Sequence, residues 1–207
     1  IHSIVSSLMD GAGQPELLLK SNNSAHTFHL KPSQIRMISE AHLVITVDEN
    51  FEIGLKKALK NISSDSLMYV SDIDNLKIYS TRDSIFEEDE EHSHSNLDYH
   101  LWLSTENVLM IANRIASRLK DIDPSNEMTY VANLQQFNSK IDKLNLALEE
   151  QLKSIQSKRI AVIDDTLQYF EKGQMLKRPV IVTPYHGARL SVKRTLEAKR
   201  MIKHLNI

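Results

Sequence analysis

The chain has 207 residues, 41% of them hydrophobic, which is enough to bury the core of one large domain or two small ones. Its 25 Lys and Arg stand against 27 Asp and Glu, so it lacks the basic excess with which proteins track a phosphate backbone, and nucleic acid is not an expected partner. It contains no cysteine, which excludes disulfides, thiolate metal sites and thiol nucleophiles, so any metal must be held by His, Asp or Glu.

Short β-rich runs alternate with helical patterns along the chain, and this alternation is the signature of an α/β fold. Between the runs, Pro32 suits the first turn of a short helix over 31–41, and apolar residues four apart predict an amphipathic helix over 50–61. The predicted strands cover residues 16–20, 41–47, 66–70, 159–164 and 178–183.

Two stronger helical patterns follow. Residues 104–119 have Ser104 or Thr105 as a cap and one apolar face. Behind Asp123 and Pro124, apolar residues then recur in steps of three and four without an internal Gly or Pro. They predict a helix of roughly 30 residues, about 45 Å long, which is longer than a small domain is wide. We therefore expect a linking helix between two lobes, with the domains at 1–120 (an N-terminal α/β lobe with an acidic His loop at 86–97), 121–157 (the helix) and 158–207 (a C-terminal α/β lobe).

The stretch FEEDEEHSHSNLDYHLWLS, residues 86–104, combines a run of carboxylates with three histidines and the one tryptophan of the chain. Its acidic half contains nothing to bury, and like charges repel, so the default expectation is a solvated loop. Its other half places His100 directly before Trp102 and a helix cap, which is a rigid setting for an imidazole.

Ligands of open α/β sheets collect outside the carboxyl ends of the strands. His26 lies in the polar loop after the first predicted strand, and Asp164 and Asp165 end the strand at 159–164. Together with His100 they offer neutral imidazole and carboxylate, which suit zinc or manganese. Each of these residues taken alone is as readily explained by a structural or merely exposed role.

Taken together, three segments resemble the periplasmic zinc-binding proteins of ABC importers, the cluster A-I substrate-binding proteins. SAHTFHLKPSQIRMISEAHLVITVDENFE, residues 24–52, is similar to their S-P-H-x-Y/F, R/K-P-S and A-D-L-V segment. Residues 98–137, beginning DYHLWLS, resemble their D-P-H-x-W-L-S-P segment, and IDDTLQYF, residues 163–170, resembles H-D-A-x-x-Y-F. The resemblance implies two α/β lobes joined by one long helix, with the metal in the cleft between the lobes.

The resemblance also implies a ligand set. Zinc is the expected ion, with manganese as the alternative, because Asp164 stands where zinc-specific members have a third histidine and a carboxylate favours a harder ion. Ala25 and Tyr99 replace the family's prolines, and by the same comparison the chain is expected to be shortened at both ends. The expected metal ligands are His26, His100 and Asp164, and the expected accessory metal residues are His92, His94 and Asp165.

The function implied is high-affinity binding of zinc in the periplasm by a monomer that delivers it to an ABC permease in the inner membrane, without catalysis. A manganese- or iron-binding importer component stays open as an alternative, as does a metal-binding adhesin or a degenerate family member without a transport role. A metal hydrolase is disfavoured, because the sequence has neither H-E-x-x-H nor a nucleophile elbow.

Overall fold

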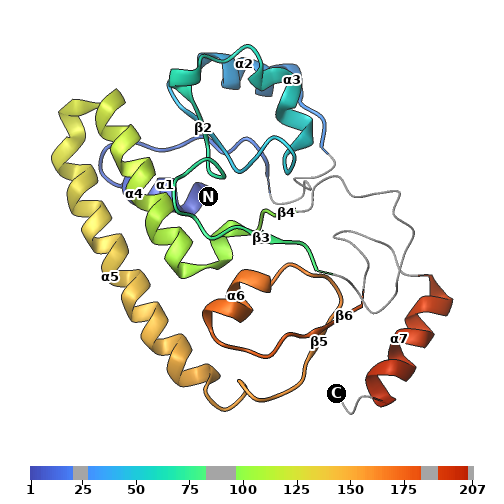
Figure 1. Cartoon of the computed structure of the whole chain (residues 1–207). Coiled ribbons are helices and arrows are strands. Elements are labelled where there is room, and N and C mark those ends of the chain that lie inside the picture. Colours follow the sequence, from blue (N-terminus) through green and yellow to red (C-terminus); the bar gives the residue numbers. More distant parts are fainter. Residues whose placement is uncertain (21–27, 83–96, 183–190, 205–207) are drawn as a thin grey trace. The chain divides into compact units, whose positions relative to one another are not determined.

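The structure is a computed structural model of the chain, and the parts that it describes are residues 1–20, 28–82, 97–182 and 191–204 (Figure 1). Contacts within the chain divide it into two compact units. The first unit comprises Ile1–Ile78 and Glu106–Lys143, and the second comprises Tyr79–Thr105 and Leu144–Ile207. Each unit is thus assembled from two separate stretches of chain.

The first unit has a two-stranded parallel sheet, in which Val44 lies opposite Leu67. A helix connects the two strands, so this is the βαβ arrangement that the alternating pattern predicts. The elements that lie wholly in this unit are α1 (His2–Leu8), α2 (Pro32–Glu40), β1 (Val44–Thr46), η1 (Ile53–Leu55), α3 (Lys56–Leu59), η2 (Ser64–Ser66), β2 (Leu67–Tyr69) and η5 (Pro124–Asn126). The unit also contains α4 (Thr105–Ile122), except its first residue, and the first part of α5 (Glu127–Leu152).

The core of the first unit forms where the sequence pattern expects it. Helix α4 buries the apolar face predicted from its spacing, including Ile111 and Ile115, both fully buried. A second cluster gathers Phe28, Ile38, Leu55 and Leu59 from α2, α3 and the chain before them. Burial of these side chains supplies the main favourable free energy of folding for the unit.

The second unit contains an antiparallel pair, with Tyr79 opposite Asp98, and a parallel pair, with Ala161 opposite Val180. A short helix connects the two parallel strands, which gives a second βαβ arrangement. The elements are β3 (Tyr79–Ser80), β4 (Leu97–Asp98), η4 (Leu101–Leu103), the end of α5, β5 (Ala161–Val162), α6 (Gln168–Gly173), β6 (Val180–Ile181) and α7 (Val192–His204).

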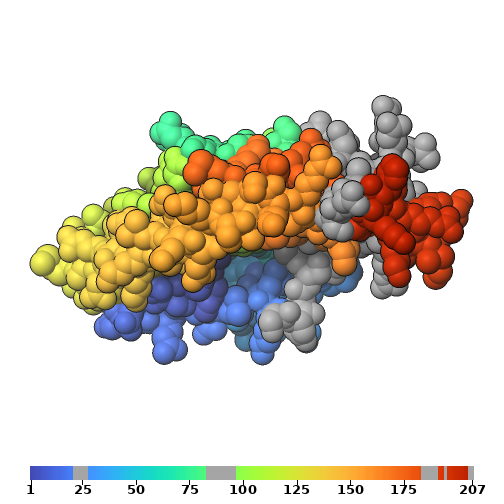
Figure 2. Space-filling model, turned by 90° about the horizontal axis from the view of Figure 1, so that it is seen from below, coloured from blue at the N-terminus to red at the C-terminus, as the bar shows by residue number. Residues whose placement is uncertain are grey.

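Helix α5 is the longest element, with 26 residues, and it contributes to both units. Tyr130 is its one buried residue, and its hydroxyl donates a hydrogen bond of 2.7 Å to Asp123, just before the helix. Much of the helix faces solvent, including Met128 and Leu146, and its yellow-to-orange surface is visible in Figure 2. A continuous helix that belongs to both units fits the linking role predicted for it.

The α/β fold class and the helices α2, α4 and α5 are confirmed. Four predicted strands are present but shorter, whereas the strand predicted at 16–20 is wrong. There the carbonyl of Leu18 accepts from the Gln34 side chain at 2.7 Å, so its partner is an amide of α2 and not a neighbouring strand. The helix predicted over 50–61 begins only at Ile53, because the carbonyl of Asp48 closes a turn by accepting from the amides of Phe51 and Glu52.

The domain boundaries 1–120, 121–157 and 158–207 stay a prediction. Within the described ranges, no helix is both long and apolar enough to cross a membrane.

Candidate metal centre

His100 lies in a tight turn between β4 and α4. The residues on either side of it, Tyr99 and Leu101, are buried, and Leu101 begins the short helix η4. The imidazole itself is 12% exposed, and its ring meets that of Trp102 edge-on with the centroids 5.5 Å apart. The buried neighbours and the ring of Trp102 therefore restrict the imidazole to a few orientations, which is the rigid setting predicted for this residue.

The buried Asp98 fixes that orientation further. Its Oδ1 accepts the backbone N–H of His100 at 3.0 Å and lies 2.7 Å from Nδ1 of the same residue. A carboxylate oxygen can only accept, so Nδ1 carries a proton, and in the neutral ring the acceptor lone pair is then on Nε2. This is the tautomer in which histidine binds metal through Nε2 while a carboxylate orients the ring from behind.

Helix α6 holds Asp98 in turn. The side chain of Gln168, which is 2% exposed, donates to Oδ2 of Asp98 at 3.2 Å and to the carbonyl of Ser80 at 2.9 Å. The hydroxyl of Tyr169 donates to the backbone carbonyl of Asp98 and accepts from the amide of Tyr79 at 3.1 Å. Burial raises the pKa of this phenol and the charge of Asp98 adds to the rise, so the hydroxyl keeps its proton and donates.

Asp164 follows strand β5 in the second unit, at the carboxyl end of the strand where the sequence predicts a ligand. It is partly buried, and its backbone carbonyl accepts from Thr166 at 3.0 Å in a turn that leads into α6. The segment that carries Asp164 therefore continues directly into the helix that holds Asp98.

Asp165 is engaged differently. Both of its oxygens accept hydrogen bonds from the guanidinium of Arg82: Oδ2 from Nε at 3.0 Å, and Oδ1 from Nη2. The remaining nitrogen of Arg82, Nη1, donates to the buried Glu171 at 2.6 Å. Burial opposes the charge on Arg82, but the hydrogen bonds to Asp165 and Glu171 outweigh it and raise the pKa of the guanidinium. This pairing supplies Asp165 with a structural role beside the accessory metal role predicted for it.

The remaining predicted ligands, His26, His92 and His94, lie outside the described residues. Among the residues that are described, no three His, Asp or Glu side chains lie close enough together to hold a metal ion. The ligand set His26, His100 and Asp164 thus stays a prediction. The described part of it comprises an oriented imidazole and a carboxylate, both in the second unit.

Sequence reasoning did not identify the residues that orient His100. Asp98 stands two positions before it, a spacing at which an aspartate can accept from the backbone amide two residues on, so the local signal was present in DYH. Gln168 could not be found in this way, because its partner Asp98 is 70 residues distant in the sequence. The same holds for Arg82, which contacts Asp165 and not His100, across 83 residues.

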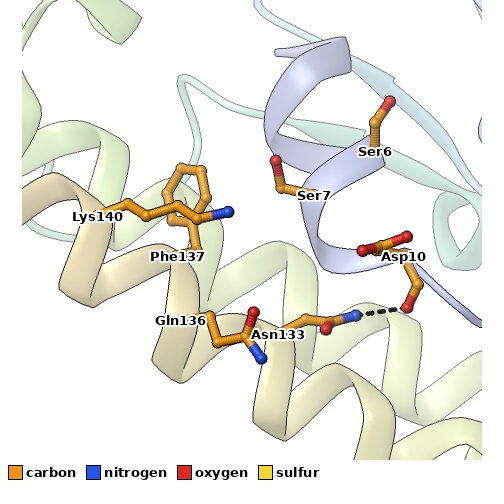
Figure 3. A pocket seen from close by; sticks show the side chains of 7 residues that line it. All are labelled: Ser6, Ser7, Asp10, Asn133, Gln136, Phe137 and Lys140. Atoms are coloured by element: carbon orange, nitrogen blue, oxygen red, sulfur yellow. Dashed lines mark hydrogen bonds between the residues drawn. The ribbon is translucent and has the colours of Figure 1, made fainter.

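A separate pocket of about 260 Å³ lies between α1 and α5 in the first unit (Figure 3). Asn133 donates 2.8 Å hydrogen bonds to the carbonyls of Leu8 and Asp10 at its edge. Of the predicted metal ligands that the structure describes, none lines it; its residues are Ser6, Ser7, Asp10, Asn133, Gln136, Phe137 and Lys140.

The fold is shared with metal-binding proteins of known structure. The crystal structure of a ZnuA protein superposes with a TM-score of 0.80 at 22% identity, over 99% of this chain and 75% of that one. All of residues 1–207 match the family described as "Zinc-uptake complex component A periplasmic". The chain belongs to this family, and the resemblance inferred from its motifs is confirmed.

Curated relatives carry the names of both metals. The "High-affinity zinc uptake system protein ZnuA" of Brucella abortus (strain 2308) is 26% identical over 219 residues, covering 89% of this chain and 66% of that protein. The "Manganese ABC transporter substrate-binding lipoprotein PsaA" of Streptococcus mitis is 26% identical over 191 residues, covering 86% of this chain and 59% of that protein. The chain therefore spans somewhat less than two thirds of the length of either relative.

Proposed function

We propose that this protein binds zinc with high affinity in the periplasm and delivers it to an ABC permease in the inner membrane. The observation that carries the proposal is the oriented imidazole of His100, with Nδ1 held by Asp98 and Nε2 as the acceptor nitrogen. Membership of the zinc-uptake family supports the choice of cargo, and the zinc uptake name of the Brucella relative agrees with it. His26 and Asp164 complete the proposed set of ligands.

Several further features belong to this proposal. The protein acts as a monomer, has no nucleic-acid partner and catalyses no reaction, since its role is to capture and release an ion. Binding of the metal gives the permease a ligand-dependent surface to recognise. The acidic stretch 86–97, with His92 and His94, acts as an accessory trap that raises the local concentration of metal.

The experiment that tests the proposal is a competitive titration of metal-free protein with zinc, followed by elemental analysis of the bound ion. The expected result is one tight zinc ion, lost in the double variant His26→Ala, His100→Ala. The matched control is His42→Ala, which removes an exposed histidine just before β1 and is expected to bind zinc like the unaltered protein. A double variant that still holds stoichiometric zinc with unchanged affinity would refute the site.

Manganese is the second candidate cargo, and Asp164 favours it. A carboxylate at this position makes the ligand set harder than three histidines would, and the Streptococcus mitis relative is named for manganese. Retention of manganese against equimolar zinc would identify a manganese carrier. Displacement by zinc does not decide, because zinc binds most nitrogen–oxygen sites more tightly than manganese does. Growth of cells that lack the gene in metal-depleted medium separates the two ions: rescue by added zinc identifies a zinc carrier, and rescue by added manganese identifies a manganese carrier.

A further inference from the structure

The hydrogen bonds around His100 form a chain that continues beyond the ring. Asp98 contacts the Nδ1 of His100 with one oxygen and the side chain of Gln168 with the other, at 2.7 and 3.2 Å. Asp98 and Gln168 are 5% and 2% exposed, so water contributes little to either contact. Hydrogen bonds in such surroundings are stronger and more directional than at a surface.

We propose that Asp98 is a positioning residue for metal binding, which holds the His100 ring with Nδ1 protonated so that Nε2 faces the ion, and that Gln168 holds Asp98 in place. This inference rests on the proposed function, since it assigns His100 as a ligand. Asp98 itself does not touch the metal. Its carboxylate orients the ring and raises the basicity of the coordinating nitrogen, as carboxylates behind metal-binding imidazoles do.

The geometry favours this role over a purely structural one. A buried aspartate needs partners, and the backbone amide of His100, the side chain of Gln168 and the Nδ1 of His100 supply them. The first two contacts are enough to satisfy the carboxylate, and they would hold the turn without any contact to the imidazole. The third sets the tautomer of a ring that is held beside Trp102 and is 12% exposed.

Gln168 connects this arrangement to the second proposed ligand. It is the first residue of α6, and the turn that begins at Asp164 leads directly into this helix. Its amide also donates to the carbonyl of Ser80 in β3, so one side chain links β3, Asp98 and the start of α6. Two hydrogen bonds, from Gln168 to Asp98 and between Asp98 and the Nδ1 of His100, thus connect the start of this helix to the imidazole.

The test combines metal affinity with the tautomer of His100. In protein with ¹⁵N-labelled histidine, long-range ¹H–¹⁵N spectra should show a protonated Nδ1 and an unprotonated Nε2 for His100 in the metal-free state, without any substitution. The substitution Asp98→Asn keeps the size of the side chain and removes its charge. It should weaken zinc binding about 10- to 100-fold and mix the two tautomers. Gln168→Ala should weaken zinc binding by a smaller factor in the same direction.

The matched control is Asp123→Asn. This aspartate also accepts from neighbouring side chains beside a helix, but it lies in the first unit, and its substitution should leave both readouts unchanged. Thermal unfolding of each variant shows that the protein is folded. The inference is overturned if the unaltered protein has His100 protonated on Nε2, or if folded Asp98→Asn binds zinc as tightly as the unaltered protein.

Failure of the proposed function is distinguishable from this outcome. If the unaltered protein binds no zinc, or binds it equally well after His100→Ala, the proposed site is wrong. If zinc binding depends on His100 but not on Asp98, the site stands and only the positioning role is lost.

Discussion

Arg82 contacts both oxygens of Asp165 and, with its remaining nitrogen, the buried carboxylate of Glu171. The three side chains are 10%, 15% and 4% exposed, so this ion pair is shielded from water, unlike the surface pairs of the chain. Removing one partner of such a pair leaves the other charges buried and uncompensated.

We therefore expect Arg82→Met to destabilise the second unit by about 3–5 kcal/mol, the range for breaking a buried ion pair. The measurement is denaturant unfolding, monitored by circular dichroism. Lys77→Met is the matched control, because the 2.6 Å pair of Lys77 with Glu106 is half exposed and its loss should cost under about 1 kcal/mol. Equal losses of stability in the two variants would contradict the structural role of Arg82.

Adjacent carboxylates should respond differently to the same substitution. Asp164→Asn should weaken zinc binding by at least about 10- to 100-fold. That is the loss typical of residues that only orient a ligand, and Asp164 is proposed to touch the ion itself. Asp165→Asn should instead lower the unfolding midpoint and leave the tight zinc affinity unchanged, because its oxygens are held by Arg82. Calorimetric titration and thermal unfolding of both variants check this, and a reversed pattern would exchange the two roles.

Deletion of the acidic His stretch tests the accessory role that we propose for it. Deleting residues 87–95 should reduce the number of weakly bound ions or slow the capture of zinc, and the slowing should shrink at high salt, because screening weakens the attraction. Equilibrium dialysis gives the stoichiometry, and stopped-flow mixing at low and high ionic strength gives the rate. If the protein that lacks residues 87–95 no longer bound the tightly held zinc ion, the acidic stretch would be part of the main site and not an accessory to it.

The pH dependence of stability should contain a contribution from Asp123. Hydrogen bonds from Ser125, Asn126 and Tyr130 lower the pKa of this carboxyl from 3.8 to about 2. Because the pKa in the folded protein is depressed, the contribution is complete above pH 3.8 and is lost as the pH falls towards about 2. Asp123→Asn should flatten the acid side of the stability profile in this window, as measured by unfolding from pH 5 to pH 2.

Gly54 lies very close to the backbone of Phe28 within the first unit. A Cβ added there would lie 2.5 Å from the backbone carbonyl oxygen of Phe28, which cannot move aside like the end of a side chain. Phe28 follows His26 by two residues. Gly54→Ala should therefore destabilise the protein by about 1–3 kcal/mol and weaken zinc binding.

Gly173→Ala serves as the control for that substitution, since nothing lies within 4 Å of its added Cβ. It should leave zinc affinity unchanged and keep or slightly raise stability, because alanine favours a helix over glycine. Thermal unfolding and zinc titration of both variants measure these outcomes. An unaffected Gly54→Ala protein would show that the chain at Phe28 adjusts without cost.

Much of the fold was predictable where one element carries its own signal. The apolar spacing of α4 and α5 identifies both helices, because burial on one face repeats along them. The pair β3 and β4 was not predictable, since each strand has two residues and its partner lies beyond the acidic stretch. At the candidate site, the sequence singled out His100 as a predicted ligand, but it could not show how the ring is held, because Asp98 is held by Gln168, which only the folded chain brings to it.

The sharing of α5 between the two units has a consequence for how the chain folds. Starting a helix is unfavourable, because several residues lose their freedom for the first hydrogen bond, whereas each later residue adds a bond of its own. Since Glu127–Leu152 is one uninterrupted helix, this starting cost arises once and serves both units. The helical turns beside Tyr130 continue directly into the turns that belong to the second unit. Once the helix has formed in one unit, it can therefore extend into the other without a second start.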